Sequence, residues 1–181
     1  MILKIARMGH PVLSQIAAPV PDPRTPEIQR LIKDMIETMI DANGAGLAAP
    51  QVHVPLRLVV FQAPGERADP GLSAEERFDH TAPLTVLVNP EIAILDETTE
   101  GGWEGCLSVP GLRGWVERPA HIRYRGLDGN GQPIERTARG FHARVVQHEV
   151  DHLDGRLYPG RMRDLSKLIF ESEIRHLAPV E

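Results

Sequence analysis

The stretch Gln147-His148-Glu149-Val150-Asp151-His152 decides how the rest of this sequence is interpreted. Residues four apart lie on one face of an α-helix, about one turn apart, so a helix here presents the imidazoles of His148 and His152 to one metal ion. Glu149 then projects beside that ion, where a carboxylate can take a proton from metal-bound water. The pattern arises by chance in roughly 3% of shuffled sequences of this composition, so alone it favours metal-dependent hydrolysis without proving it.

A tetrahedral catalytic site usually has three protein ligands and a water, so a third ligand has to be found. The extended motif of one metalloprotease class needs a histidine where this chain has Tyr158. Glu171 or Glu173 would serve instead in another kind of zinc peptidase. Cys106, the only cysteine of the chain, is the better candidate, although a single free cysteine is more often a small buried residue.

Composition narrows the class of protein. The chain has 181 residues, of which 41% are apolar, which predicts one domain with one sizeable core. A net charge of −5 and a pI near 5.9 argue against stable nucleic acid binding through overall positive charge. A lone cysteine and the lack of a signal peptide predict a cytoplasmic location, and no apolar run approaches the ~20 residues that a membrane span needs.

Periodicity and capping signals predict four helices, at residues 10–17, 25–43, 141–153 and 165–177. Strand composition predicts six strands, at residues 56–61, 84–88, 92–95, 113–117, 121–127 and 134–137. The stretch 63–83, rich in Pro, Gly, Glu and Asp, is expected to be a long surface loop. His142 would lie about 120° around the helix from His148, so we expect a packing or surface histidine outside the ligand set.

The small-residue run from Gly44 to Gln51 has two interpretations with equal support. It is either a tight loop that joins a helix to a strand, or a backbone that must approach a substrate closely. The run contains no lysine and lacks the spacing of a phosphate loop, so nucleotide binding is set aside.

Three segments taken together resemble the peptide deformylase family of the bacterial type. The family's Gly-x-Gly-Leu-Ala-Ala-x-Gln stands here as Gly44 to Gln51, its Glu-Gly-Cys-Leu-Ser as Glu104 to Ser108, and its Gln-His-Glu-x-Asp-His as Gln147 to His152. Their order and spacing agree with the family. The opening Gly9-His10-Pro11-Val12-Leu13 is also similar, so the resemblance covers nearly the whole chain.

The resemblance implies an α+β fold in which one catalytic domain, residues 1–181, packs antiparallel strands around a central metal-binding helix. It implies Cys106, His148 and His152 as metal ligands and Glu149 as the catalytic acid and base. The implied reaction removes the N-formyl group from the initiator methionine of newly synthesised polypeptides and releases formate. The implied cofactor is one divalent metal ion, Fe²⁺ before others, with Ni²⁺, Co²⁺ or Zn²⁺ able to occupy the same ligands.

The resemblance also implies how the substrate is held. The side-chain amide of Gln51 and the backbone N–H of Leu107 would donate to the oxygen that gains negative charge, and Gly46 belongs to the same catalytic set. The substrate-binding positions implied by the family are Gly44, Ala45, Phe141 and Val145.

Two features depart from the family. Arg144 stands where many members have an apolar residue, which leaves the depth and polarity of the pocket rim open. The loop 63–83 is longer than in the shortest members, and its role is not readable from the sequence.

Two other classes of protein stay open. One is a metallopeptidase with Glu171 or Glu173 as third ligand. The other is a binding module stapled by a metal ion, without catalysis. A set of one cysteine and two histidines leaves a coordination position open, which disfavours the second class because structural sites usually have four protein ligands.

Formyl-methionine chains emerge from the ribosome, and some relatives dock there through a C-terminal helix. The segment 161–176 carries a mild positive excess on an acidic protein, which predicts a weak, transient and salt-sensitive contact with RNA phosphates. A solvated amphipathic helix explains the same charges more readily.

Overall fold

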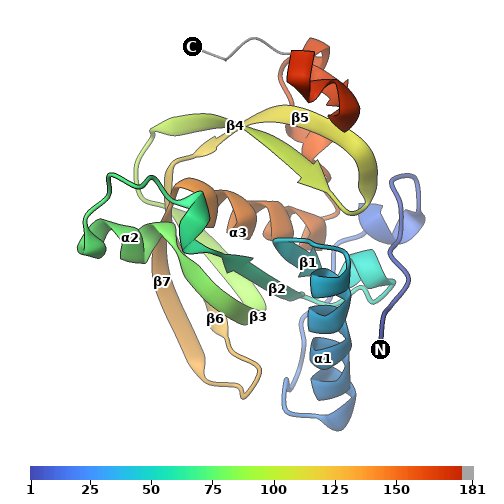
Figure 1. The fold of residues 1–181 in the computed structure, drawn as a ribbon. Coiled ribbons are helices and arrows are strands. Elements are labelled where there is room, and N and C mark those ends of the chain that lie inside the picture. The colour runs from blue at the N-terminus through green and yellow to red at the C-terminus, as the bar shows by residue number, and fades with distance from the viewer. Residues whose placement is uncertain (177–181) are drawn as a thin grey trace.

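Two antiparallel sheets enclose one long helix, α3 (Gly140–Leu153), as Figure 1 shows. The computed structural model describes residues 1–176. The larger sheet has the strand order β1-β2-β3-β6-β7 and the smaller one β4-β5-β8. The α+β fold with antiparallel strands around the helix that carries both motif histidines is therefore confirmed.

The strands of the larger sheet are β1 (Gly46–Ala48), β2 (Leu58–Ala63), β3 (Ala82–Ile94), β6 (His121–Leu127) and β7 (Pro133–Arg139). Those of the smaller sheet are β4 (Thr99–Cys106), β5 (Val109–Pro119) and β8 (Leu168–Phe170). The other α-helices are α1 (Pro26–Asp41) and α2 (Ala74–His80). Short 3-10 helices are η1 (Pro11–Ser14), η2 (Ala49–Val52), η3 (Gly65–Arg67), η4 (Tyr158–Arg161), η5 (Leu165–Lys167) and η6 (Glu171–His176).

Helix α3 is buried on both sides because a sheet lies on each. Val146, Val150 and Leu153 pack into an apolar cluster with Phe61 and Tyr124 of the larger sheet. Each such fully buried side chain contributes about 1.5–3 kcal/mol to folding. The opposite face of the helix carries polar residues toward β4 and β5. Apolar packing therefore holds one face of α3 against the larger sheet, and the other face can carry the residues of a functional site.

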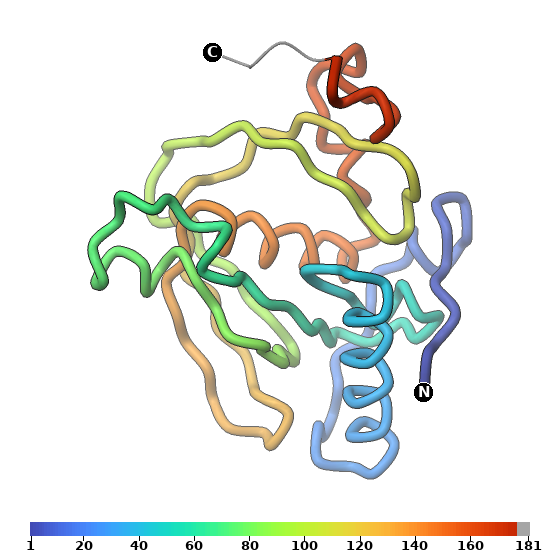
Figure 2. Tube along the Cα trace, in the orientation of Figure 1, coloured from blue at the N-terminus to red at the C-terminus, as the bar shows by residue number. Residues whose placement is uncertain are grey.

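Helix α1 covers the end of the larger sheet near β1, as the trace in Figure 2 shows. Thr25 caps it by accepting a hydrogen bond from the backbone N–H of Ile28, and Pro26 occupies the first turn, where no N–H is needed. Met35 and Met39 are fully buried against β1 and β2. The start and apolar face predicted for this helix are confirmed, and it ends at Asp41, two residues before the predicted end.

The segment 63–83, predicted to be a long surface loop, does lie at the surface, but it is not a loop throughout because it contains η3 and α2. Ser73 and Glu76 form a capping box at the start of α2, each side chain bonding the other residue's backbone N–H. None of the residues of α2 is buried, so the apolar periodicity that reveals a helix was missing.

The two strands predicted at 84–88 and 92–95 are one strand, β3, with a register shift between Val88 and Glu91. Asn89 lies in the left-handed region with φ of 51°, and its side chain exchanges two hydrogen bonds of 2.9 Å with the backbone of Val20. This bulge re-aims the strand without ending it.

Strand β4 was missed because its glycines have low strand propensity. Each of three glycines makes room for a side chain of a neighbouring element, since an added Cβ would lie 2.4 Å from Trp115 at Gly101, 2.8 Å from Arg144 at Gly102 and 2.7 Å from Arg113 at Gly105. The glycines therefore serve packing, a purpose that propensity cannot reveal.

The prediction of a C-terminal helix at 165–177 is wrong for the residues that the structure describes. They form η5, β8 and η6, and β8 adds to the edge of β5, with Ile169 opposite Arg113. The open edge of β5 offers backbone partners that a solvated helix would leave unpaired. Leu177 lies outside the described residues. The helix predicted at 10–17 is likewise only η1.

None of the helices within residues 1–176 combines the length and the apolar character that a membrane crossing requires.

His142 is a fully buried packing residue, so the packing half of its prediction is confirmed and the surface half is wrong. It bonds the carbonyl of Asp79 at 2.8 Å and the hydroxyl of Tyr124 at 3.1 Å. Burial, which the bond to Asp79 only partly offsets, lowers the pKa of His142 from 6.5 to about 4.

Because the unfolded chain binds this proton more tightly, the stability that a neutral His142 provides is complete above pH 6.5 and is lost as the pH falls toward 4. We expect the wild type to lose about 2 kcal/mol more unfolding free energy than His142→Gln between about pH 7 and pH 5, since glutamine keeps a donor and does not titrate. Urea unfolding at the two pH values measures this, and equal losses in both proteins would contradict it.

Candidate metal centre

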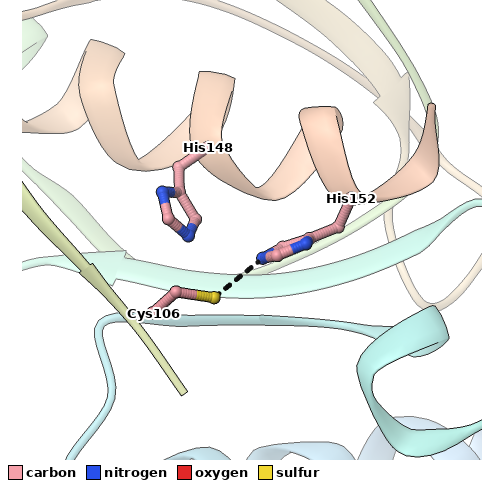
Figure 3. A group of neighbouring side chains, drawn as sticks. All are labelled: Cys106, His148 and His152. Atoms are coloured by element: carbon pink, nitrogen blue, oxygen red, sulfur yellow. Dashed lines mark hydrogen bonds between the residues drawn. The ribbon is translucent and has the colours of Figure 1, made fainter. Parts of the chain in front are cut away.

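Cys106, His148 and His152 converge on one point between α3 and the end of β4. Their ligand atoms all lie within 4.8 Å of one another, with Cys106 Sγ 3.3 Å from His152 Nε2. Figure 3 shows both imidazoles projecting from one face of α3 toward the sulfur. One sulfur and two imidazole nitrogens suit a late divalent metal ion and leave a coordination position open.

Glu104 fixes which nitrogen of His148 faces the ligand group. Its Oε2 lies 2.8 Å from His148 Nδ1. Burial alone would raise the pKa of Glu104, but hydrogen bonds from Arg118 and His148 outweigh burial and hold that pKa well below its usual range. An ionised carboxylate only accepts, so His148 donates through Nδ1–H and its Nε2 lone pair is left for a metal ion.

Arg118 of β5 connects the smaller sheet to α3 behind the ligand group. It donates to both oxygens of Glu104, at 2.5 and 2.9 Å, and to Asp151 at 2.9 Å. Asp151 also accepts from Arg161 Nε at 3.1 Å. All three buried members of this network, Glu104, Arg118 and Asp151, are at most 5% exposed. The motif residue Asp151 therefore anchors α3 next to His152 rather than binding a metal itself.

The Glu149 carboxylate is buried beside the ligand group. Glu149 as a whole residue is 3% exposed, and its Oε2 has no hydrogen-bond partner among the described residues. Burial raises the pKa of Glu149 to about 7. A carboxyl group with such a pKa can both take up and release a proton near neutral pH.

Gln51 holds the opposite wall. Its Oε1 accepts from the backbone N–H of Ala48 at 2.8 Å, and its Nε2 donates to Ser108 Oγ at 3.1 Å and faces Cys106 Sγ at 3.5 Å. The backbone N–H of Ser108 also points to that sulfur, at 3.4 Å. Donors from two segments thus surround the thiol and can stabilise its thiolate.

The candidate site opens into a cavity of about 450 Å³. Ten of the eleven site residues expected from the sequence line it, namely Gly44, Ala45, Gly46, Gln51, Cys106, Leu107, Phe141, Val145, His148 and Glu149. His152 lies behind them, where it is 1% exposed. The small-residue run 44–51 therefore does form part of a cavity wall. Gly44 and Ala45 are a short loop between α1 and β1, and the rest of the run forms β1 and most of η2.

Gly46 has a reason to be glycine that the sequence did not reveal. A Cβ added there would lie 2.3 Å from Glu149 Oε1, far inside contact distance. The carboxylate occupies the space that any other residue at 46 would fill.

Arg144 is not a free charge at the rim. Its Nη1 donates to Glu104 Oε1 at 2.8 Å and to the carbonyl of Val116 at 2.9 Å, and its Nη2 donates to the carbonyl of Glu100 at 2.8 Å. The position that departs from the family pattern thus braces α3 against β4 and β5, and it still lines the cavity.

Glu171 and Glu173 do not belong to the ligand group, because within residues 1–176 that group consists of Cys106, His148 and His152 alone. Glu171 instead pairs with Arg113. The ligand expected of a metallopeptidase is therefore missing from the place where it would be needed.

Sequence reasoning missed the roles of Glu104, Arg118 and Tyr158. Tyr158 stacks on His148 with ring centroids 6.2 Å apart, although it had been considered only as a failed ligand position. Glu104 supports His148, which lies 44 residues away in the sequence, so spacing along the chain does not reveal the contact. Arg118 left no local signal.

Comparison with known proteins places this geometry in context. A family model described as polypeptide deformylase matches residues 2–168. Peptide deformylase 1 of Bordetella pertussis is 56% identical over 169 residues, covering 92% of this chain and 91% of the relative. A crystal structure of peptide deformylase from Ehrlichia chaffeensis superposes with a TM-score of 0.82 at 32% identity, covering 92% of this chain and 91% of that one. The class I type b enzyme of Acinetobacter baumannii, in a crystal structure with Met-Ala-Ser bound, has a TM-score of 0.77 at 37% identity and covers 90% of this chain and 99% of its own.

We expect Gly46→Ala to reduce hydrolytic turnover by at least about tenfold, because its Cβ displaces the Glu149 carboxylate, while unfolding free energy falls by about 1–3 kcal/mol. Kinetics, metal content and denaturant unfolding measured on one preparation check this. Gly65→Ala is the matched control, since nothing lies within 4 Å of an added Cβ there. Full turnover in Gly46→Ala would show that the carboxylate position is unimportant.

Proposed function

Because this chain belongs to the polypeptide deformylase family, it is a metallohydrolase that removes the N-formyl group from newly synthesised polypeptides, and we propose which of its residues perform each step. The observation that carries the proposal is the convergence of Cys106, His148 and His152 beside the buried Glu149 carboxylate. The formyl group leaves as formate and the peptide keeps a free methionine amine.

We propose Cys106, His148 and His152 as the protein ligands and Fe²⁺ as the ion, with Ni²⁺, Co²⁺ or Zn²⁺ able to substitute. The donor set supports this, because a thiolate with two neutral imidazoles accepts any of these ions. The bound ion would supply a Lewis acid that polarises the formyl carbonyl and lowers the pKa of water. Ser108 N–H and Gln51 Nε2 would stabilise the ligand thiolate.

Glu149 is proposed as the proton carrier. Its free Oε2 would take a proton from the attacking water and then deliver it to the amine nitrogen as the C–N bond breaks. A pKa of about 7 suits both directions of transfer at neutral pH. Gly46 keeps the carboxylate in place by leaving open the space that its other oxygen, Oε1, occupies.

The developing negative charge on the formyl oxygen needs hydrogen-bond donors. The proposed donors are the Gln51 side-chain amide, whose Nε2 faces the ligand sulfur, and the backbone N–H of Leu107, the residue after Cys106. Gln51 is 1% exposed and bonded to Ala48, so its amide is held rigid before the substrate arrives.

The methionine side chain is proposed to enter the apolar part of the cavity. Ala45, Phe141 and Val145 line that part, and Gly44 lets Leu107 approach, since a Cβ at 44 would lie 3.0 Å from Leu107 Cδ1. The Acinetobacter baumannii relative that holds Met-Ala-Ser supports a short Met-peptide as the ligand of this cavity.

Further proposals concern the molecule's setting. We propose that residues 1–181 act as one catalytic domain, which the packing of α3 against the larger sheet and its hydrogen bonds to the smaller one support. The substrate would be an N-formyl-Met nascent peptide, met in the cytoplasm. A transient ribosome contact stays a prediction, although the continuous C-terminal helix expected to make it is not what the described residues form.

Glu149→Gln should keep the metal ion and the fold but lose most turnover, by about a hundredfold or more, because it removes the proton carrier and no ligand. The measurement is formate release from a formyl-Met peptide under anaerobic conditions, with metal content determined on the same wild-type and variant samples. Absence of formate release by a metal-loaded wild type would overturn the proposed function. Metal loss in the variant would instead make Glu149 a ligand.

Cys106→Ser should lower metal content or metal affinity by about tenfold or more, since an alcohol does not deprotonate as a thiol does and is a poorer ligand for a late divalent ion. Metal analysis after dialysis, together with turnover, checks this. Unchanged metal content and activity in Cys106→Ser would remove Cys106 from the proposed ligand set.

A further inference from the structure

An ion pair between Arg113 and Glu171 lies at the open edge of the catalytic cavity. Arg113 Nε and Nη2 donate to Glu171 Oε1 at 3.1 and 2.6 Å. Both residues line the cavity, and their side chains are 36% and 53% exposed. The pair is therefore on the solvent side of the site, where a peptide whose formyl group is at the metal has to leave.

The backbone fixes both partners at this edge. Arg113 lies on β5, opposite Ile169 of β8, and Glu171 begins η6 directly after β8. The Arg113 guanidinium lies against the backbone of Gly105, where an added Cβ would be 2.7 Å from Nη1. Gly105 precedes the ligand Cys106, so this cation is held close to the reacting centre.

Glu171 is the carboxylate that balances charge at this edge. Three arginines and three glutamates line the cavity, namely Arg67, Arg113, Arg144, Glu104, Glu149 and Glu171. Arg144 is paired with Glu104 in the interior, and Glu149 is buried at the ligands. Arg67 lies over the ring of Phe141 at 4.7 Å, without an ion-pair partner among residues 1–176.

The family model matches residues 2–168, and the segment that carries Glu171 follows that match. Its contact with Arg113 is made by the segment that directly follows β8 of the smaller sheet.

We propose that Glu171 is a specificity-determining residue for the part of the peptide that follows the formyl-methionine, an inference that rests on the proposed function. Glu171 already forms an ion pair with Arg113, so a substrate carboxylate must displace Glu171 before it can pair with the guanidinium. Removing the charge of Glu171 frees Arg113 and turns the enzyme toward peptides with acidic residues downstream. Because the pair is exposed, the effect is a few-fold and is screened by salt.

The test compares wild type and Glu171→Gln on three C-terminally amidated peptides, formyl-Met-Ala-Glu, formyl-Met-Ala-Gln and formyl-Met-Ala-Lys. We expect the ratio of kcat/KM for the Glu peptide over the Gln peptide to rise by roughly two- to fivefold in the variant at low salt, mainly through KM, and the ratio for the Lys peptide to fall. Both changes should largely vanish at about 0.5 M salt.

Two controls make the outcome specific. Glu91→Gln removes a comparable exposed carboxylate, whose side chain is 66% exposed and paired with Arg125 away from the cavity, and it should leave the ratios unchanged. In an Arg113→Gln background, Glu171→Gln should no longer raise the ratio for the Glu peptide, because no freed cation is present.

An unchanged ratio, an equal change for all three peptides, or a rise that persists without Arg113 would each overturn the inference and leave Glu171 a structural contact of η6. Formate release from the Gln peptide by the wild type shows separately that the proposed function holds.

Discussion

The carboxylate of Glu104 is the group on which the rest of the site depends. It accepts from Arg118, Arg144 and His148, and so joins β4 and β5 to the polar face of α3. Removing one partner from such a buried network typically costs about 3–5 kcal/mol, because a charge is left unpaired in the interior. The network makes only one docking of the helix favourable, and that docking brings the two imidazoles to the sulfur.

The apolar face of α3 contributes mainly to stability, and its polar face fixes the positions of the site residues. Apolar packing against the larger sheet is strong but tolerates small shifts, since contacts of similar size can replace one another. Directed hydrogen bonds to Glu104 and Asp151 tolerate much less. Arg144 donates a further hydrogen bond to the carboxylate of Glu104. The arginine that stands here in place of an apolar residue therefore helps to fix the group that orients His148, at the edge of the substrate cavity.

How well each element or site residue could be predicted depends on whether the interactions that form it are local or join segments that are distant in the sequence. The histidine pair and Glu149 could be placed because helix periodicity is local, and α1 because its cap and apolar face are local. Cys106 was only one of several candidate ligands until the resemblance was considered, since its distance to His152 is created by folding. Helix α2 depends on capping by exposed residues, and strand β8 depends on the open edge of a sheet. The partners of Glu104 come from segments that are distant in the sequence. Composition and spacing reveal none of these three.

The close approach of Gly46 to Glu149 limits how this enzyme can diverge. A lineage that changed its substrate preference would have to reshape the cavity wall formed by residues 44–46. At 46 every larger side chain occupies the space of the carboxylate, so the change that reshapes the wall also removes the proton carrier. New substrate preferences are therefore accessible through Gly44, Ala45 or the cavity face of α3, and position 46 is closed to that route for as long as the chemistry relies on Glu149.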